Sequence, residues 1–225
     1  MSLHSADPEV PGFVLAGGQS SRMGRDKAVV LLGGQPLVVH TLGILRRAGL
    51  EATIAGGDAV LGEFAPVIPD GAAGQGPLSG ICAALESSSA ALAVFLPVDL
   101  PLLPDSAISF LLHHARVTGA PATLFSVNGF AETFPAVVAR AALPALKREL
   151  EAGGRGCFSG FRAAARGLES ELAILPVEML VQAGQLFHPL RQPVGRWFLN
   201  VNTPESLRRA HWYLSPSENI SVARR

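Results

Sequence analysis

The sequence predicts an α/β protein in which a single domain is built on one doubly wound, mostly parallel sheet, with an antiparallel element in its second half. Short apolar runs alternate with amphipathic helix patterns through the first half, which is the signature of such a sheet. The length of 225 residues suits one sizeable domain with a real core. A hydrophobic fraction of 48% against 16% charged residues is typical of a globular chain rather than a disordered one.

The elements of the first half follow from these apolar runs and their boundaries. Residues 12–16 are apolar on both faces, as expected of a central parallel strand. Pro36 suits the first turn of a helix that Gly49 ends. Residues 91–96 form the clearest strand. The other expected elements are an extended piece at 29–32, strands at 51–55 and 66–68, and helices at 58–64, from Pro77, and at 105–116.

The second half is less regular. Strands are expected at 121–127 and 134–139, joined by a loop that opens with the turn dipeptide Asn128-Gly129. Thr203 can cap a last helix that has Pro204 in its first turn. The remaining expectations are helices at about 141–152 and 157–166, a strand at 172–177, mostly loop at 178–195, a short strand at 197–199, a flexible leader at 1–10 and a disordered tail at 215–225.

Composition excludes several classes of function. The 18 basic and 18 acidic residues give a net charge of zero, which argues against a general binder of nucleic acid or membrane surfaces. Cys82 and Cys157 form no CxxC pair, so a reduced, cytosolic setting is expected. The first ten residues lack the features of a signal peptide, and the longest apolar run, 90–98, is too short to span a membrane. We therefore expect a cytoplasmic protein.

The loop over residues 14–27 is the main candidate for a binding site. It leaves a buried strand, contains two adjacent glycines and ends between the cations Arg22 and Lys27. Backbone N–H groups in such a loop can converge on an anion, and nearby cations neutralise it. The loop has neither Walker A nor G-x-G-x-x-G spacing, and an ordinary glycine-rich βα connection is the alternative. The joint presence of Ser20, Arg22, Gly24 and Lys27 favours phosphate binding.

Two carboxylates are expected at the same edge of the sheet. Ligands of doubly wound sheets sit beyond the carboxyl ends of the strands, which places the glycine loop, Asp70 and Asp99 at one crevice. Asp99 could hold Mg²⁺ together with substrate phosphates, or it could cap the following turn. Asp70 has the same two interpretations, with capping favoured. Asn200 and Asn202 precede the last helix and could be no more than its start.

At this point five sequence blocks resemble one family. The run Leu15-Ala16-Gly17-Gly18-x-Ser20-x-Arg22-Met23-Gly24-x-Asp26-Lys27 closely resembles the opening signature of the nucleotidyltransferases that act on molybdenum cofactor. Later blocks match in order and spacing: 33–37, 76–81, 97–101 and 200–205. Gly17 and the run Gly-Pro-Leu-x-Gly look like the guanylyltransferase version, since the cytidylyltransferase relatives usually carry Leu-Ala-Ala-Gly. The resemblance spans residues 12 to about 213.

The resemblance implies a Rossmann-like nucleotidyltransferase fold that transfers GMP from MgGTP to molybdenum-molybdopterin, giving the guanine dinucleotide cofactor and pyrophosphate. It assigns catalytic roles to Arg22, Lys27 and Asp99, and Mg²⁺ binding to Asp99 with Asn202 as a weaker second ligand. The nucleotide-binding half is expected at about 11–118 and the acceptor-binding half at about 119–214. The nucleotide contacts it implies are Leu15, Ala16, Gly17, Gly18, Ser20, Lys27, Asp70, Gly76, Pro77, Leu78 and Asp99.

The same resemblance implies partners. They are GTP and a molybdopterin-type acceptor as substrates, and molybdoenzyme apoproteins or other cofactor-biosynthesis proteins, with no nucleic acid or membrane. A monomer or weak homo-oligomer is expected. Two other functions stay open: a cytidylyltransferase, or another nucleotidyltransferase with a different phosphorylated acceptor, and a non-catalytic nucleotide-binding protein that handles the cofactor. The intact Arg22, Lys27 and Asp99 argue against the last.

The chain departs from the family pattern in the hairpin. Relatives tend to carry a basic residue or histidine just before the hairpin proline, where this chain reads Glu132-Thr133-Phe134-Pro135. The second half should bind the pterin, so this departure bears on the acceptor. Candidates for contacting an anionic acceptor, each with solvated surface arginine as the simpler interpretation, are Arg155, Arg162, Arg191 and Arg196.

Overall fold

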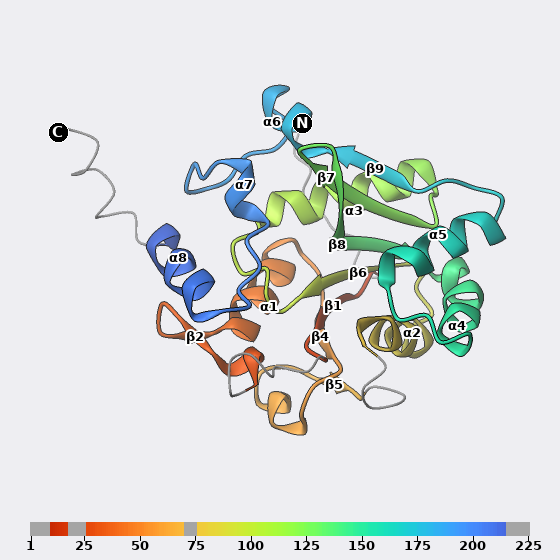
Figure 1. The fold of residues 1–225 in the computed structure, drawn as a ribbon, viewed down its shortest axis with the longest axis horizontal. Helices are drawn as coiled ribbons and strands as arrows, with labels where there is room; N and C mark the ends of the chain where they lie inside the picture. Colours follow the sequence, from red (N-terminus) through yellow and green to blue (C-terminus); the bar gives the residue numbers. More distant parts are fainter. Residues whose placement is uncertain (1–9, 18–25, 70–75, 215–225) are drawn as a thin grey trace.

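Seven strands form one sheet in the computed structural model, which describes residues 10–17, 26–69 and 76–214 (Figure 1). Their order across the sheet is β5-β4-β1-β6-β8-β7-β9. The first four strands run parallel, β8 is antiparallel to both β6 and β7, and β9 is parallel to β7. The bounds are β1 Gly12–Leu15, β4 Ala52–Ala55, β5 Val67–Ile68, β6 Leu92–Pro97, β7 Ala122–Val127, β8 Phe130–Ala139 and β9 Ala173–Pro176. The predicted fold class is thereby confirmed.

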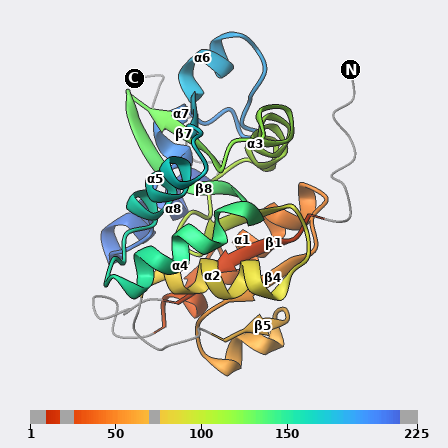
Figure 2. The ribbon, with the colours of Figure 1, turned by 90° about the vertical axis from the view of Figure 1, so that its right-hand side faces the viewer.

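Helices cover both faces of the sheet and make a three-layer structure (Figure 2). One face packs against α1 (Leu37–Arg47), α3 (Asp105–Thr118) and α8 (Pro204–Leu214). The other packs against α2 (Pro77–Ser87), α4 (Leu143–Glu151) and α5 (Cys157–Gly167). Successive side chains of a strand point to opposite faces. The neighbouring residues Phe13 and Val14 of β1 accordingly enter the two different cores.

A small hairpin separates the first strand from α1. The strands β2 (Leu31–Leu32) and β3 (Gln35–Pro36) are joined by Gly33 and Gly34, whose φ angles are +58° and +82°. Two consecutive positive φ angles favour glycine and close a tight two-residue turn. Pro36 therefore belongs to β3 and directly precedes the first residue of α1. The sequence had predicted it one step later, inside the first turn of the helix.

One prediction for the segment after β9 is wrong. The predicted strand at 197–199 does not form, because Trp197 ends the helix α7 (Val194–Trp197). Residues 178–195 are mostly loop as predicted, apart from the rest of α6 (Val177–Gln182) and the start of α7. Pro193 presets the backbone for α7. The indole of Trp197 is buried, and its N–H donates to the Gln192 carbonyl at 2.8 Å, which fixes the turn. Three apolar residues in a row do not distinguish a strand from a buried helical turn.

Smaller differences concern element types and ends. The short helix predicted at 58–64 is the 3₁₀ helix η2 (Ala59–Glu63), capped by the Asp58 side chain. The turn Asn128-Gly129 is a tight connection with both φ angles positive, so β8 begins at Phe130 rather than at residue 134. The predicted tail and residues 1–9 of the leader lie outside the described ranges, whereas Val10 is buried in the core.

The carboxyl ends of β1 and β6 define the edge of the sheet that carries the candidate site. Asp99 follows β6 directly, and the Val201 N–H donates to its backbone carbonyl at 2.9 Å. This hydrogen bond brings the start of α8 to the same edge, although more than 100 residues separate the two positions. Within the described part of the chain, no helix is both long enough and apolar enough to cross a bilayer.

Candidate active site

Three predicted site residues meet at the carboxyl edge of the sheet. The Lys27 ammonium donates to Asp99 Oδ2 at 2.9 Å and also to Asn202 Oδ1. The Lys27 and Asp99 side chains are 19% and 16% exposed, so the ion pair is largely but not fully removed from water. The sequence predicted a common edge for Lys27 and Asp99. The family resemblance implied Asn202 beside Asp99, and the structure adds its contact with Lys27.

The chain holds Lys27 at this position through the single 3₁₀ turn η1 (Lys27–Val29). The Asp26 carboxylate caps the turn by accepting from the Ala28 N–H at 2.9 Å. The Ala28 side chain is fully buried and anchors the turn in the core. The cap by Asp26 and the burial of Ala28 therefore fix the backbone position of Lys27.

Asn202 is positioned by the backbone around it. Val201 is fully buried and tethered to the Asp99 carbonyl. The Ser206 hydroxyl accepts from the N–H groups of Asn202 and Thr203, both at 3.0 Å, and the Ser206 N–H donates to Thr203 Oγ1 at 3.1 Å. This network begins α8 as the sequence predicted. It also points the Asn202 amide oxygen at Lys27.

One carboxylate oxygen of this cluster is available to a cation or a ligand. Asp99 Oδ1 is buried and, among the described residues, has no hydrogen-bond partner. A buried carboxylate oxygen without a donor is unfavourable unless a cation or ligand satisfies it. Mg²⁺ prefers oxygen ligands and is commonly bound by one or two carboxylates plus substrate phosphates. In the described part of the chain, no group of three or more His, Cys, Asp or Glu residues could hold a metal ion.

The end of β1 lies against the turn that follows β4. The Ala16 N–H donates to the Ala55 carbonyl at 3.1 Å, and Leu15 accepts from the Val98 N–H at 3.1 Å. A Cβ on Gly57, whose φ is +88°, would lie 3.2 Å from the Ala16 Cβ and 2.7 Å from Leu61 Cδ1. Gly57 thus permits the close approach of this turn to Ala16 at the end of β1. The glycine pair at 56–57 is the signal in the sequence that could have indicated this close approach.

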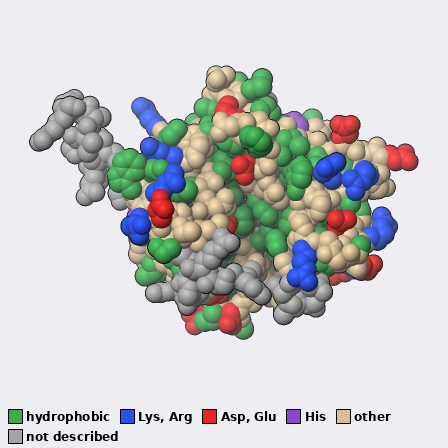
Figure 3. Space-filling view, viewed as in Figure 1, with side chains coloured by type: hydrophobic (Ala, Val, Ile, Leu, Met, Phe, Trp, Pro, Cys, Tyr) green, Lys and Arg blue, Asp and Glu red, His purple; other side chains and the backbone are tan. Residues whose placement is uncertain are grey.

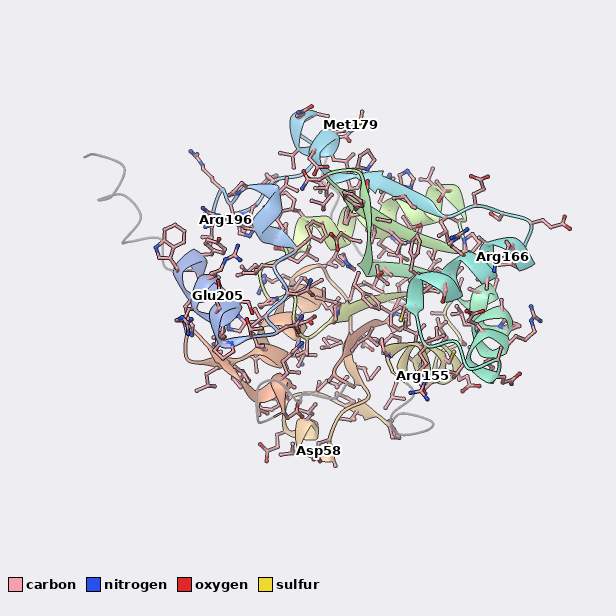
Figure 4. The ribbon with its side chains drawn as sticks, in the orientation of Figure 1. Asp58, Arg155, Arg166, Met179, Arg196 and Glu205 are labelled. Carbon is pink, nitrogen blue, oxygen red and sulfur yellow. The ribbon has the colours of Figure 1, made fainter. Side chains whose placement is uncertain are left out.

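The start of α2 forms another border of this edge. Gly76 has a φ of +78° and precedes the helix, and Pro77 occupies its first turn as predicted. The Leu78 side chain is fully buried and packs against Gly160. Leu78 can therefore reach a ligand only through its main chain. The backbone of Arg155 passes near Gly76, and Figure 4 shows the Arg155 side chain near the start of α2.

The other predicted site residues fall into two groups. Gly18, Ser20, Arg22 and Asp70 lie outside the described residues. Gly17 is described and half-buried just past the end of β1. Among the candidate acceptor arginines, Arg196 has a structural partner set: its guanidinium lies 4.2 Å from the Tyr213 ring centroid and donates to Gln192 Oε1 at 2.7 Å (Figure 4). That contact ties α7 to α8.

Among the residues that the structure describes, basic side chains do not crowd the face of the site. Figure 3 shows a hollow near the centre of this face in which hydrophobic side chains are exposed, with most visible Lys and Arg side chains toward the two margins. Within the described part of the chain, Lys27 is the cation placed at the cluster, and the zero net charge agrees with local rather than general anion recognition.

Both cysteines are excluded as nucleophiles. Burial raises the pKa of Cys82 to about 11 and that of Cys157 to about 12, so both thiols stay protonated at neutral pH. Both side chains pack into the core beneath α2 and α5. The residues that do meet at the edge, an ammonium, a carboxylate and an amide, suit phosphate and metal binding rather than covalent catalysis.

Comparison with known proteins places these features in a family. Residues 12–165 match the family model described as the MobA-like NTP transferase domain. The chain is 33% identical to the molybdenum cofactor guanylyltransferase of Rhizobium meliloti over 91% of each chain. It is 39% identical to that of Rhodobacter capsulatus over 45% of this chain and 57% of that one. The crystal structure of molybdopterin-guanine dinucleotide biosynthesis protein A from Archaeoglobus fulgidus has the same fold, with a TM-score of 0.73 at 24% identity, covering 91% of this chain and 98% of that one.

Proposed function

Because this chain belongs to the MobA-like NTP transferase family and is an enzyme of the nucleotidyltransferase type, we propose that it transfers GMP from GTP to molybdenum-molybdopterin. The products are the guanine dinucleotide cofactor and pyrophosphate. The observation that carries the proposal is the convergence of Lys27, Asp99 and Asn202 at the carboxyl edge of the sheet. The name of the full-length relative from Rhizobium meliloti supports the choice of nucleotide and acceptor.

The reaction needs no nucleophile from the protein. An oxygen of the acceptor's terminal phosphate attacks the α-phosphorus of GTP in line, a new P–O bond forms, and the bond to the β-phosphate breaks to release pyrophosphate. The protein contributes position and charge. The end of β1 holds the nucleotide against the sheet, and the Lys27 ammonium stabilises negative charge on the phosphates. Asp99 and Asn202 are the residues that would hold Mg²⁺, which neutralises phosphate charge when bound.

We assign nucleotide binding to residues 11–118 and acceptor binding to residues 119–214. The strand order supports this division, because β1, β4 and β5 lie on one side of β6, and β8, β7 and β9 lie on the other. Within the first half, the proposed contacts are Leu15, Ala16, Gly17, Gly18, Ser20, Lys27, Asp70, Gly76, Pro77 and Leu78, with Arg22 beside the phosphates. The proposed setting is the cytoplasm, and the proposed recipients are molybdoenzyme apoproteins or other cofactor-biosynthesis proteins.

The decisive experiment compares GTP with CTP. Purified protein is incubated with Mg²⁺, molybdenum-molybdopterin and either nucleotide, and pyrophosphate and the dinucleotide product are both measured. We expect product with GTP and little with CTP. Product with CTP alone would identify a cytidylyltransferase and contradict the assignment from Gly17. Tight GTP binding without pyrophosphate release would identify a non-catalytic binding protein.

A further inference from the structure

We propose that Glu132 recognises the pyrimidine edge of the pterin in the acceptor, and so determines acceptor specificity; this inference rests on the proposed function. The residue lies in β8, outside the cluster of Lys27, Asp99 and Asn202. Its carboxylate has the chemistry that the pterin edge requires, and the sheet places it at a suitable position.

The register of the sheet puts Glu132 at the same edge as Asp99. Phe95 of β6 and Leu124 of β7 both pair with Ala136 of β8, so these three residues share one level. After a register shift, Phe125 pairs with Glu132. Because β8 runs against β6, Glu132 lies beyond that level in the direction in which β6 continues to its carboxyl end.

The segment that leads to α8 connects the two positions. Cross-strand partners point to the same face of a sheet, so Glu132 shares a face with Phe125. The Phe125 ring makes an edge contact with Phe198 at a centroid distance of 6.1 Å. Three residues later the Val201 N–H donates to the Asp99 carbonyl. The segment 198–201 therefore runs from the face of the sheet that carries Glu132 to the residue that directly follows β6.

The Glu132 carboxylate is kept without a protein partner. It is half-buried, and among the described residues no cation lies within salt-bridge distance of it and no donor bonds to it. Desolvation raises the pKa of its carboxyl group. A half-buried carboxylate without a partner lowers the stability of the folded protein when it is ionised, because its charge is partly removed from water. A ligand that supplies donors would remove that penalty.

The pterin edge is the complementary group. The 2-amino-4-oxopyrimidine ring of a pterin presents a ring N–H and an adjacent amino group, two parallel donors that match the two oxygens of a carboxylate. The pterin ring and the phosphate lie at opposite ends of molybdopterin. An acceptor with its phosphate near Asp99 would therefore extend its pterin ring along the sheet edge toward β8.

The test compares Glu132→Gln with wild type and with Glu171→Gln, which removes an exposed carboxylate just before β9. Steady-state KM values for acceptor and for GTP are measured separately. Binding of pterin-6-carboxylate and of lumazine, which lacks the 2-amino group, is followed by their fluorescence without turnover. We expect Glu132→Gln to raise the acceptor KM about 10- to 100-fold with an unchanged KM for GTP, and to abolish the preference for the pterin over lumazine. Glu171→Gln should behave as wild type.

Each result decides the matter. An unchanged acceptor KM and an unchanged pterin preference in Glu132→Gln would overturn the inference, as would an equal rise in both KM values. Glu132→Asp keeps the charge and should lose less acceptor affinity than the amide variant; a loss as large as that of the amide would contradict charge recognition. If wild type forms no dinucleotide, the proposed function fails, whereas the fluorescence comparison still tests the carboxylate directly.

Discussion

Replacing Asp99 by asparagine removes one negative charge from the centre of the site while preserving the size of the side chain. The structure separates its effect on catalysis from its effect on the fold. The contact that brings α8 to the site uses the Asp99 backbone carbonyl, which the substitution leaves intact. The lost interactions are the 2.9 Å ion pair with Lys27 and the proposed metal ligand, while Lys27 keeps its contact with Asn202.

The expected magnitudes differ for stability and turnover. Charged hydrogen bonds contribute about 1.5–3 kcal/mol each, and both side chains here are less than one fifth exposed. Because an amide oxygen still accepts from Lys27, we expect a loss of unfolding free energy at or below the lower end of that range. Removing one group that stabilises charge in a transition state lowers kcat on the order of 10²- to 10³-fold. The Mg²⁺ concentration needed for half-maximal activity should rise as well.

The assay is the initial rate of pyrophosphate release from GTP and acceptor across a Mg²⁺ titration, with thermal unfolding of the same samples. The matched control is Glu86→Gln, which breaks another lysine–carboxylate pair, with Lys147, at the opposite end of α2. It should leave kcat unchanged. A kcat of Asp99→Asn near the wild-type value at saturating Mg²⁺ would refute the assigned role of the carboxylate. If Asp99→Asn shows no cooperative unfolding transition, the expectation that the substitution leaves the fold intact is refuted.

Three further predictions concern other parts of the molecule. Lys27→Met should lower kcat in the GTP assay by removing transition-state charge stabilisation, and a raised KM for GTP with normal kcat would contradict this. Gly57→Ala places a Cβ against Leu61 and Ala16 at a positive φ, so calorimetry should show a loss of about 1–3 kcal/mol of stability together with weaker GTP binding. The pKa of Glu132 is higher in the folded than in the unfolded state, so ionisation destabilises the protein above that pKa. Glu132→Gln should therefore melt higher than wild type near pH 7, with a difference that vanishes in acid; a pH-independent difference would count against the desolvation.

The architecture of the first half was predictable because its signals are local. Apolar runs that end at glycine or proline define β1, β4 and β6, and apolar residues at helical spacing define α2 and α3. The same locality explains the errors. The apolar run 197–199 does not by itself distinguish a strand from a buried helical turn, and the hydrogen bond from Trp197 to the Gln192 carbonyl is not predictable from the sequence. The Asn128-Gly129 dipeptide predicted a turn, but the length of β8 depends on its pairing with β7.

For the candidate site, too, local features were predictable from the sequence and long-range contacts were not. The residue types in the glycine loop, the carboxylate after β6 and the capped start of α8 determined the chemistry, since strand ends and helix caps are short-range features. Which of these groups touch was decided by tertiary structure alone, because the Asn202–Lys27 contact joins residues 175 positions apart. That contact requires the α8 segment to dock on the Asp99 backbone. Likewise, the place of Glu132 toward the same edge follows from the register of β8 between β6 and β7, which is a property of the assembled sheet.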